Sequence, residues 1–211
     1  MSNTFLPLTG YQLIEQIYNG SRTQVYRGIR SLDQKLVVIK LLKSEYPTFN
    51  ELVQFRNQYT IAKNLDNPGI IKPLTLENYG NGYALVMEDY GDISLKHEME
   101  RWGDRGMGIN FNFLREFLYI SIAIVQALES LYHNRIIHKD IKPDNILIHP
   151  ETKQIKLIDF SIASLLPREN QEIQTPNVLE GTLAYMSPEQ TGRMNRGIDY
   201  RTDFYSLGVT L

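Results

Sequence analysis

Apolar and polar residues follow a strand-like pattern in the first part of the chain. Residues 11–18, 23–29 and 35–43 are rich in β-branched and aromatic residues and are separated by turn residues. Residues 70–77 and 83–90 resume the same composition after an interruption. The pattern therefore predicts strands over these five stretches.

The periodicity changes to that of an α-helix after Thr48. Apolar residues then recur three or four positions apart, at Leu52, Phe55, Tyr59, Ala62 and Leu65. The tripeptide 67–69, Asn-Pro-Gly, stops this helix. A short helix is predicted over residues 93–102. Residues 113–133 are apolar and unbroken by glycine or proline, which predicts a buried helix, and residues 201–211 begin a last helix.

The predicted elements divide the chain in two. A strand-rich part with one helix comes first and a mainly helical part follows, with the boundary near residues 88–93. We therefore expect two lobes, residues 1–90 and residues 91–211. A chain of this length can bury a sizeable core, and no internal repeat or low-complexity tract interrupts it.

Composition narrows the class of protein. Apolar residues make up 42% of the chain and charged residues 22%, which is ordinary for a globular protein. The net charge of −2 offers no general attraction to nucleic acid or to an anionic membrane. The absence of cysteine excludes disulfides and thiolate metal sites and permits a reducing compartment. With no secretory signal and apolar stretches far short of a membrane span, we expect a cytoplasmic chain without a membrane segment.

The stretch HKDIKPDNILI, residues 138–148, concentrates candidate chemistry. It places two carboxylates, two lysines, a histidine and an amide in eight positions before an apolar strand. Taken alone, these side chains either converge on one reaction or solvate a surface turn.

Two further features could serve a phosphate group. Gly20, between two predicted strands, would let the backbone approach a polyphosphate closely, although a lone glycine also suits a plain turn. Lys40 ends an apolar strand and is either an edge residue reaching water or a buried cation awaiting an anion. The glycine-rich segment 102–110 follows a helix rather than a strand, so we interpret it as a connector.

Together, the motifs resemble those of the Ser/Thr protein kinase family, in its order and at its spacings. They are Gly20 to Val25, Val37-Val38-Ile39-Lys40, His138-Lys139-Asp140 with Asn145, Asp159-Phe160-Ser161, and Ser187-Pro188-Glu189. The resemblance covers essentially the whole chain. It implies a bilobal α+β fold with an antiparallel-sheet N-lobe carrying one main helix. A mainly helical C-lobe, incomplete at its end, would follow.

The resemblance also implies an ATP site. Lys40 matches the strand lysine that grips the α- and β-phosphates. Gly20, Val25 and Val38 match the roof of the nucleotide pocket, and Leu147 matches its floor. Met87 matches the residue at the back of the pocket, and Glu88 to Tyr90 match the hinge.

The catalytic residues follow from the same resemblance. Asp140 matches the residue that accepts the substrate hydroxyl proton, and Lys142 matches the lysine typical of Ser/Thr kinases beside the transferring phosphoryl group. Thr182 matches the threonine that sits against this pair. Asn145 and Asp159 match the two Mg²⁺ ligands, and oxygen donors suit this hard cation.

Several positions depart from the family pattern. Tyr18 and Thr23 replace two of the three loop glycines, which should stiffen the loop. Gln58 falls where a glutamate usually pairs with Lys40, unless the register is one turn out; Glu51, about 10 Å away along the helix, is too far to substitute. Ser161 replaces a glycine, which costs free energy only if the position needs a positive φ.

Other residues are assigned supporting roles. Lys139 replaces the usual arginine before the catalytic aspartate and could pair with a loop phosphate only as a point charge. We expect His138 to be a packed loop histidine and Asp203 to anchor the catalytic loop. Ser164 and Thr175 are candidate phosphosites in the activation loop. The remaining histidines show no ligand spacing: His97, His133 and His149.

The resemblance leaves two main functions open. The first is an ATP- and Mg²⁺-dependent kinase acting on Ser/Thr of protein substrates, and the second is a nucleotide-binding or inert pseudokinase module that regulates a partner. A small-molecule phosphotransferase is disfavoured by Lys142 and by GTLAYMSPEQ, which suit a protein substrate. The last residues also resemble large bacterial signalling proteins with fused ATPase and sensor modules. We therefore expect a fragment with apolar surface exposed near Phe204, Leu207 and Val209.

Overall fold

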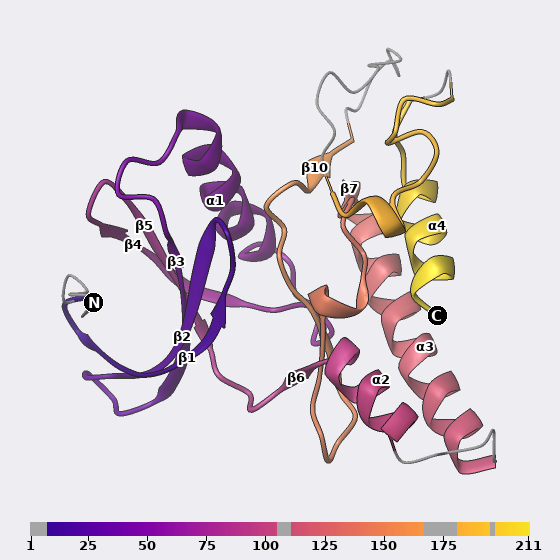
Figure 1. The fold of residues 1–211 in the computed structure, drawn as a ribbon, viewed down its shortest axis with the longest axis horizontal. Coiled ribbons are helices and arrows are strands. Elements are labelled where there is room, and N and C mark those ends of the chain that lie inside the picture. The colour runs from indigo at the N-terminus through magenta and orange to yellow at the C-terminus, as the bar shows by residue number, and fades with distance from the viewer. Residues whose placement is uncertain (1–7, 105–110, 167–180, 195–196) are drawn as a thin grey trace. The chain divides into compact units, whose positions relative to one another are not determined.

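The computed structural model describes residues 8–104, 111–166, 181–194 and 197–211 (Figure 1). The chain forms two compact units, the first made of Met1–Asn64 and Lys72–Tyr90, the second of Leu65–Ile71 and Gly91–Leu211. The sequence pattern places residues 65–71 in the first lobe. They belong to the second unit because Leu157 forms backbone hydrogen bonds with Gly69 and Ile71, at 2.8 and 2.9 Å.

The first unit is built on a five-stranded sheet with the strand order β1-β2-β3-β5-β4 (Figure 1). All its neighbouring strands pair antiparallel, so the expected antiparallel sheet is confirmed. The strands are β1 Tyr11–Asn19, β2 Thr23–Arg30, β3 Leu36–Leu42, β4 Pro73–Tyr79 and β5 Gly82–Glu88.

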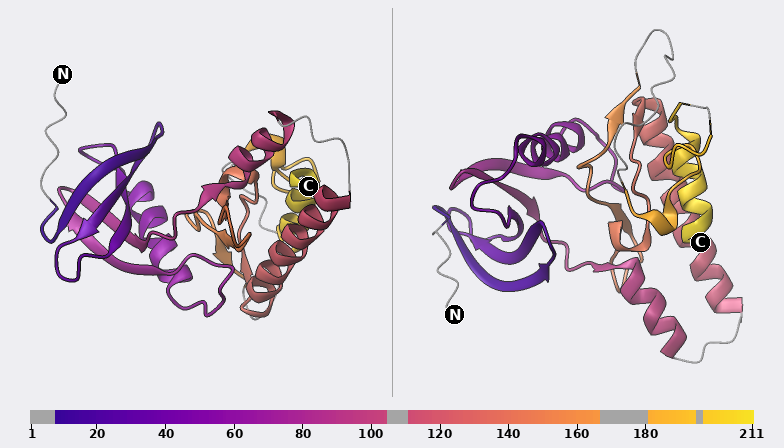
Figure 2. Two further views of the ribbon diagram at one scale, coloured as in Figure 1. Left: turned by 90° about the horizontal axis from the view of Figure 1, so that it is seen from below. Right: turned by 45° about the horizontal axis from the view of Figure 1, so that its top comes forward.

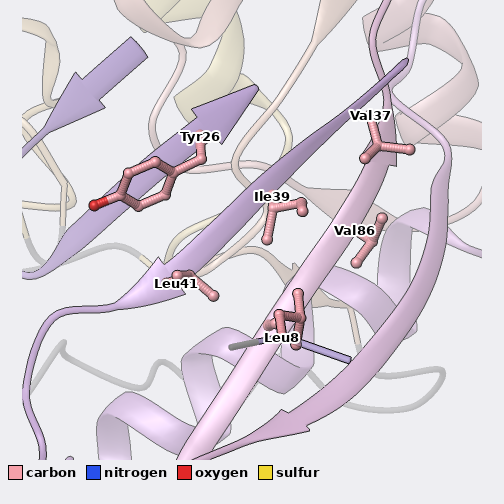
Figure 3. Close-up of a cluster of buried hydrophobic side chains, with 7 residues drawn as sticks. Leu8, Tyr26, Val37, Ile39, Leu41 and Val86 are labelled. Atoms are coloured by element: carbon pink, nitrogen blue, oxygen red, sulfur yellow. The ribbon is translucent and has the colours of Figure 1, made fainter. Parts of the chain in front are cut away.

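The two faces of β3 have different surroundings. Val37, Ile39 and Leu41 alternate along the strand and are buried in a core with Leu8, Tyr26, Ala84 and Val86 (Figure 3). Because side chains alternate across a strand, Val38 and Lys40 lie on the opposite face. The core of the first unit therefore sets which residues of β3 are left for a site.

Helix α1, Phe49–Ala62, begins with a capping box. The Thr48 hydroxyl accepts from the backbone N–H of Glu51, and the Glu51 carboxylate accepts from the backbone N–H of Thr48 at 2.8 Å. This backbone hydrogen bond lowers the pKa of Glu51. The Glu51 carboxylate is thus used at the start of the helix. This agrees with the expectation that Glu51 lies too far along the helix to act as the partner of Lys40. The helix packs on β4 and β5 and buries Phe55, Gln58, Ile61 and Ala62.

In the part that the structure describes, the second unit combines three helices with short strands (Figure 2). The helices are α2 Leu95–Asp104, α3 Phe111–His133 and α4 Arg201–Thr210. One small sheet joins β6 Ile93–Ser94, β8 Ile146–Ile148 and β9 Ile155–Leu157, and another joins β7 Ile136–Ile137 to β10 Ser164–Leu165. Two 3₁₀ turns complete it, η1 Pro143–Asn145 and η2 Leu183–Tyr185.

Helix α3 has a buried stripe that packs toward β7 and β9, formed by Ile120, Ile124, Ala127, Leu128 and Leu131. Among the described residues it is the one helix long and apolar enough to cross a membrane by length and composition. The expectation that every apolar stretch is far too short was therefore wrong on length. The finding is weak evidence for a span, because core helices of soluble proteins have the same properties.

Buried charges join three parts of the second unit. Glu98 of α2 is 1% exposed and pairs with Arg101 and with Lys153, each at 2.9 Å. Lys153, in the turn between β8 and β9, also pairs with Glu116 of α3 at 2.8 Å. The buried carboxylate of Glu98 thus has two cationic partners, which offset the cost of burying its charge.

Helix α4 only partly matches the expected apolar surface. Phe204 and Val209 are exposed, but Leu207 is buried at 8% exposure. The sequence period alone could not separate these positions, because the helix packs against η2 on one side.

Truncation of Phe55 should destabilise the first unit. Its side chain is 2% exposed, so Phe55→Ala removes buried area and leaves a cavity. We expect the free energy of unfolding to fall by about 3–5 kcal/mol, measured by urea denaturation. Phe49→Ala is the matched control, because Phe49 lies in the same helix at 79% exposure. A similar loss from both variants would contradict the assigned core.

Candidate functional site

Several predicted nucleotide-site residues lie on or beside the face of β3 that is opposite the core. Lys40 lies opposite Val25 of β2, and Val38 lies opposite Met87 of β5. Directly opposed residues of antiparallel strands point to the same face. The structure therefore brings Val25, Val38, Lys40 and Met87 together on the face turned away from the core.

Lys40 has an uncharged helix partner. Its Nζ donates to Gln58 Oε1 at 2.9 Å, and both residues are buried, at 9% and 5% exposure. The helix register read from the sequence is therefore right. The amide accepts a hydrogen bond but carries no charge, so it stabilises the ammonium less than a carboxylate would.

The loop around Gly20 is held by side chains. The Tyr18 ring lies across Gly20, and a Cβ atom at position 20 would come 2.5 Å from the Tyr18 hydroxyl. Lys43 Nζ donates to Asn19 Oδ1 at 3.1 Å, and Gly20 N–H donates to the Thr23 carbonyl at 2.9 Å. These contacts hold the loop between β1 and β2, and its expected stiffness stays a prediction.

The segment after β5 is tied to its own unit. Tyr90 donates from its hydroxyl to Glu88 at 2.7 Å. Asp89 is paired with Arg27 of β2, and this hydrogen bond raises the pKa of Arg27. No signal in the sequence points to the Arg27–Asp89 pair, because the two residues lie 62 positions apart. The pair holds the expected hinge segment, Glu88 to Tyr90, against the sheet.

In the second unit, Asp140 is the centre of a closed polar network. Lys142 Nζ donates to Asp140 Oδ2 at 2.7 Å and to Thr182 Oγ1 at 2.6 Å. Thr182 in turn donates to Asp140 Oδ1 at 2.9 Å. Asn145 Nδ2 donates to Asp140 Oδ2 at 2.8 Å and to its carbonyl at 2.9 Å. Four predicted site residues from two distant segments are therefore brought together.

The backbone of this loop is held by Asp203 from α4. Its carboxylate accepts from the backbone N–H groups of His138 and Lys139, each at 2.8 Å. Asp203 is 3% exposed, and burial raises the pKa of its carboxyl. Lys139 has φ +70°, a left-handed conformation that is uncommon for a residue with a Cβ atom.

His138 packs inside the loop. It is fully buried, its Nδ1 accepts from the Asp140 N–H at 3.3 Å, and its Nε2 lies 3.0 Å from the Ile158 carbonyl. These neighbours are satisfied by the tautomer with the proton on Nε2. Phe160 completes the packing, edge-on to the imidazole at 4.8 Å between ring centres. Both nitrogens are thus used in structural contacts.

Phe160 belongs to the Asp159-Phe160-Ser161 segment, whose backbone angles can be compared with the family pattern. Asp159 has φ +66°, whereas Ser161 is not among the described residues with positive φ. Serine at position 161 therefore carries no left-handed strain. A serine would cost free energy here only if position 161 needed a positive φ, and it does not have one.

Asn145 and Asp159 offer the donors that a magnesium ion prefers. Both hydrogens of the Asn145 amide are directed at Asp140, which leaves Oδ1 as the atom for a cation. Within the described ranges no group of three or more His, Cys, Asp or Glu could hold a metal. Carboxylate and amide oxygens suit Mg²⁺ completed by phosphate oxygens and water, and Asn145 and Asp159 as its ligands stay a prediction.

The remaining candidates are placed as follows. Leu147 is the central residue of β8, opposite Ser94 and Lys156. Ser164 lies in β10, paired with Ile137. Thr175 lies outside the described residues.

Comparison with known proteins points to one family. The family model for the protein kinase domain matches residues 11–211. A probable serine/threonine-protein kinase of Clostridium perfringens is 31% identical over 95% of this chain, and serine/threonine-protein kinase PrkC of Bacillus subtilis is 33% identical over 95%. Serine/threonine-protein kinase PknA of Mycobacterium tuberculosis is 30% identical over 94%. The chain spans 28%, 29% and 45% of these relatives.

The two hydrogen bonds to Asp203 yield a stability prediction. In Asp203→Asn an amide NH₂ faces one of the two N–H donors, so one buried hydrogen bond is lost. We expect the free energy of unfolding to fall by about 1–3 kcal/mol, measured by denaturant titration. Asp144→Asn is the control, because that aspartate forms an exposed pair with Lys96 at 3.5 Å and should change stability by less than about 1 kcal/mol. Equal effects would argue against the anchoring role.

Proposed function

The chain belongs to the Ser/Thr protein kinase family, and we propose that it transfers the γ-phosphoryl group of ATP to serine or threonine hydroxyls of protein substrates. The observation that carries the proposal is the network of Asp140, Lys142, Asn145 and Thr182. It presents a carboxylate, a cation and a metal-ligand amide together, as phosphoryl transfer requires.

We assign proton acceptance to Asp140 Oδ1. Its other oxygen, Oδ2, already accepts from Lys142 and Asn145. Oδ1 accepts from the Thr182 hydroxyl, so it faces a hydroxyl donor of the kind that a substrate serine or threonine supplies. As the substrate oxygen attacks phosphorus, its proton would pass to this carboxylate.

We assign Lys142 and Lys40 to interactions with the anionic phosphate groups of ATP. Lys142 lies within hydrogen-bond distance of both Asp140 and Thr182 and would stabilise charge on the phosphoryl group in transfer. Lys40 would bind the α- and β-phosphates, oriented by Gln58.

Asn145 and Asp159 are the residues that would hold Mg²⁺. When bound, the ion would neutralise phosphate charge. The apolar part of the nucleotide site is assigned to the free face of β3 and its neighbours, with the backbone of Glu88 to Tyr90 for the base edge. The residues proposed for contact with the nucleotide are Gly20, Val25, Val38, Met87 and Leu147.

A pseudokinase that only binds nucleotide is the second candidate, and the neutral partner of Lys40 favours it. The loop with Tyr18 and Thr23 in place of glycines points the same way. The side-chain network around Asp140 favours the enzyme, because a module that only binds nucleotide has no need of a proton acceptor. Fused ATPase and sensor modules in a longer protein, and a cytoplasmic location, stay predictions.

Asp140→Asn tests the proposed chemistry. The amide keeps the shape and can still contact Lys142 and Thr182, but it cannot accept the hydroxyl proton. We expect transfer of radiolabelled phosphate from ATP to a generic basic protein to fall by roughly 10²–10⁴-fold.

An ATP-dependent rise in melting temperature, with and without Mg²⁺, serves as the parallel readout for binding. Equal transfer by both proteins would refute the enzymatic proposal. A shift without any transfer would support the pseudokinase, and no shift would count against both.

Gln58→Glu tests the cost of the uncharged partner. A carboxylate in its place would pair with Lys40 ionically and hold it more firmly in position. We expect the transfer rate to rise by up to about tenfold, measured at saturating ATP and Mg²⁺. Gln54→Glu makes the same change one turn earlier and should leave the rate unaltered. No gain from the Gln58 variant would show that the missing charge does not limit the reaction.

A further inference from the structure

Lys139 immediately precedes Asp140 and has an unusual backbone conformation. It is held at φ +70°, where a residue with a Cβ atom is disfavoured. Such a conformation persists only when its surroundings hold it. Asp203 does so at the N–H of Lys139. A second contact is made at the carbonyl of the same residue.

That second contact comes from Gln190. Its Nε2 donates to the Lys139 carbonyl at 2.8 Å, and the side chain is 2% exposed. The residues lie 51 positions apart, and Gln190 ends the stretch GTLAYMSPEQ, in which the sequence analysis gave it no role of its own. The carbonyl it binds belongs to the peptide group that leads into Asp140.

The other end of the Gln190 amide is also engaged. Oε1 accepts from the Ser187 N–H at 3.1 Å and from its hydroxyl at 3.3 Å, and Ser187 is fully buried. A backbone N–H can only donate and a carbonyl can only accept. The orientation of the amide is therefore set by its partners, and an ionised carboxylate at this position could satisfy only the Ser187 end.

Gly181 completes the surroundings of the same carbonyl. It has φ +122°, and a Cβ atom there would lie 3.1 Å from the Lys139 oxygen and 3.5 Å from Gln190 Nε2. The next residue is Thr182, which contacts both Asp140 and Lys142. The chain thus passes close to the Lys139 carbonyl immediately before it delivers the Thr182 hydroxyl.

We propose that Gln190 is a positioning residue, which clamps the Lys139 carbonyl and so holds Asp140 and Thr182 in register. Asp203 and Gln190 would fix the two ends of the strained residue from different elements. The inference rests on the proposed phosphoryl transfer for its kinetic consequence, but the clamp itself can be tested without activity. The competing view is that Gln190 only stabilises its own turn.

Gln190→Glu in the 211-residue chain is the sharpest test. It retains the acceptors for Ser187 and replaces the donor with an oxygen that repels the Lys139 carbonyl when ionised. We expect kcat to fall about tenfold at alkaline pH, with KM for ATP unchanged. Burial raises the pKa of an introduced carboxyl. On acidification the protonated group could donate again, so the rate relative to the parent chain should recover.

Hydrogen–deuterium exchange supplies the readout that needs no catalysis. The peptide covering residues 138–142 should exchange several-fold faster in the Gln190→Glu chain than in the parent. Thr191→Val is the matched control, because its hydroxyl donates to the Pro188 carbonyl at 2.8 Å within the same turn. It should alter neither the exchange of that peptide nor kcat.

Gly181→Ala is the second variant should Gln190→Glu fail to fold. It crowds the same carbonyl and leaves Gln190 in place, so faster exchange over residues 138–142 is again expected. Unchanged exchange in a folded variant, or equal effects from Thr191→Val, would overturn the clamp. Faster exchange in a chain with no phosphoryl transfer would uphold the clamp and refute the proposed activity instead.

Discussion

The buried carboxylate of Asp203 is the contact on which the second unit's site depends. It has left water, and burial raises its pKa, so it is held by backbone donors rather than by solvent. Those donors are the N–H groups of His138 and Lys139. The carboxylate gains two hydrogen bonds, and they hold the backbone at His138 and Lys139, where Lys139 has a positive φ.

A different constraint organises the first unit. Alternation along β3 gives one face to the core of Val37, Ile39 and Leu41 and leaves Val38 and Lys40 on the other. A lysine buried at 9% exposure needs a partner. The amide oxygen of Gln58 is one such partner, and it is uncharged.

Departures from the family pattern differ in their physical weight. Ser161 carries no left-handed strain because its backbone does not adopt a positive φ, whereas the nearby Asp159 does. Tyr18 has a visible consequence, since its ring occupies the space above Gly20. The helix of Gln58 is in the expected register. Residue identity alone could not rank these changes, because their costs depend on dihedral angles and neighbours.

The sequence by itself determined the strands and helices, the positions of the motifs and the chemical type of each site residue. Periodicity and motif spacing are local properties, so the order of residues is enough to show the family resemblance from which roles for Lys40, Asp140 and Asn145 are predicted. Only the tertiary structure decided what lies across long sequence gaps. Residues 65–71 belong to the second unit through Leu157, Arg27 pairs with Asp89, and Gln190 reaches Lys139 over 51 positions. Hydrogen bonds of this kind leave no periodic trace, because each needs only one polar side chain brought near by the packing of other elements.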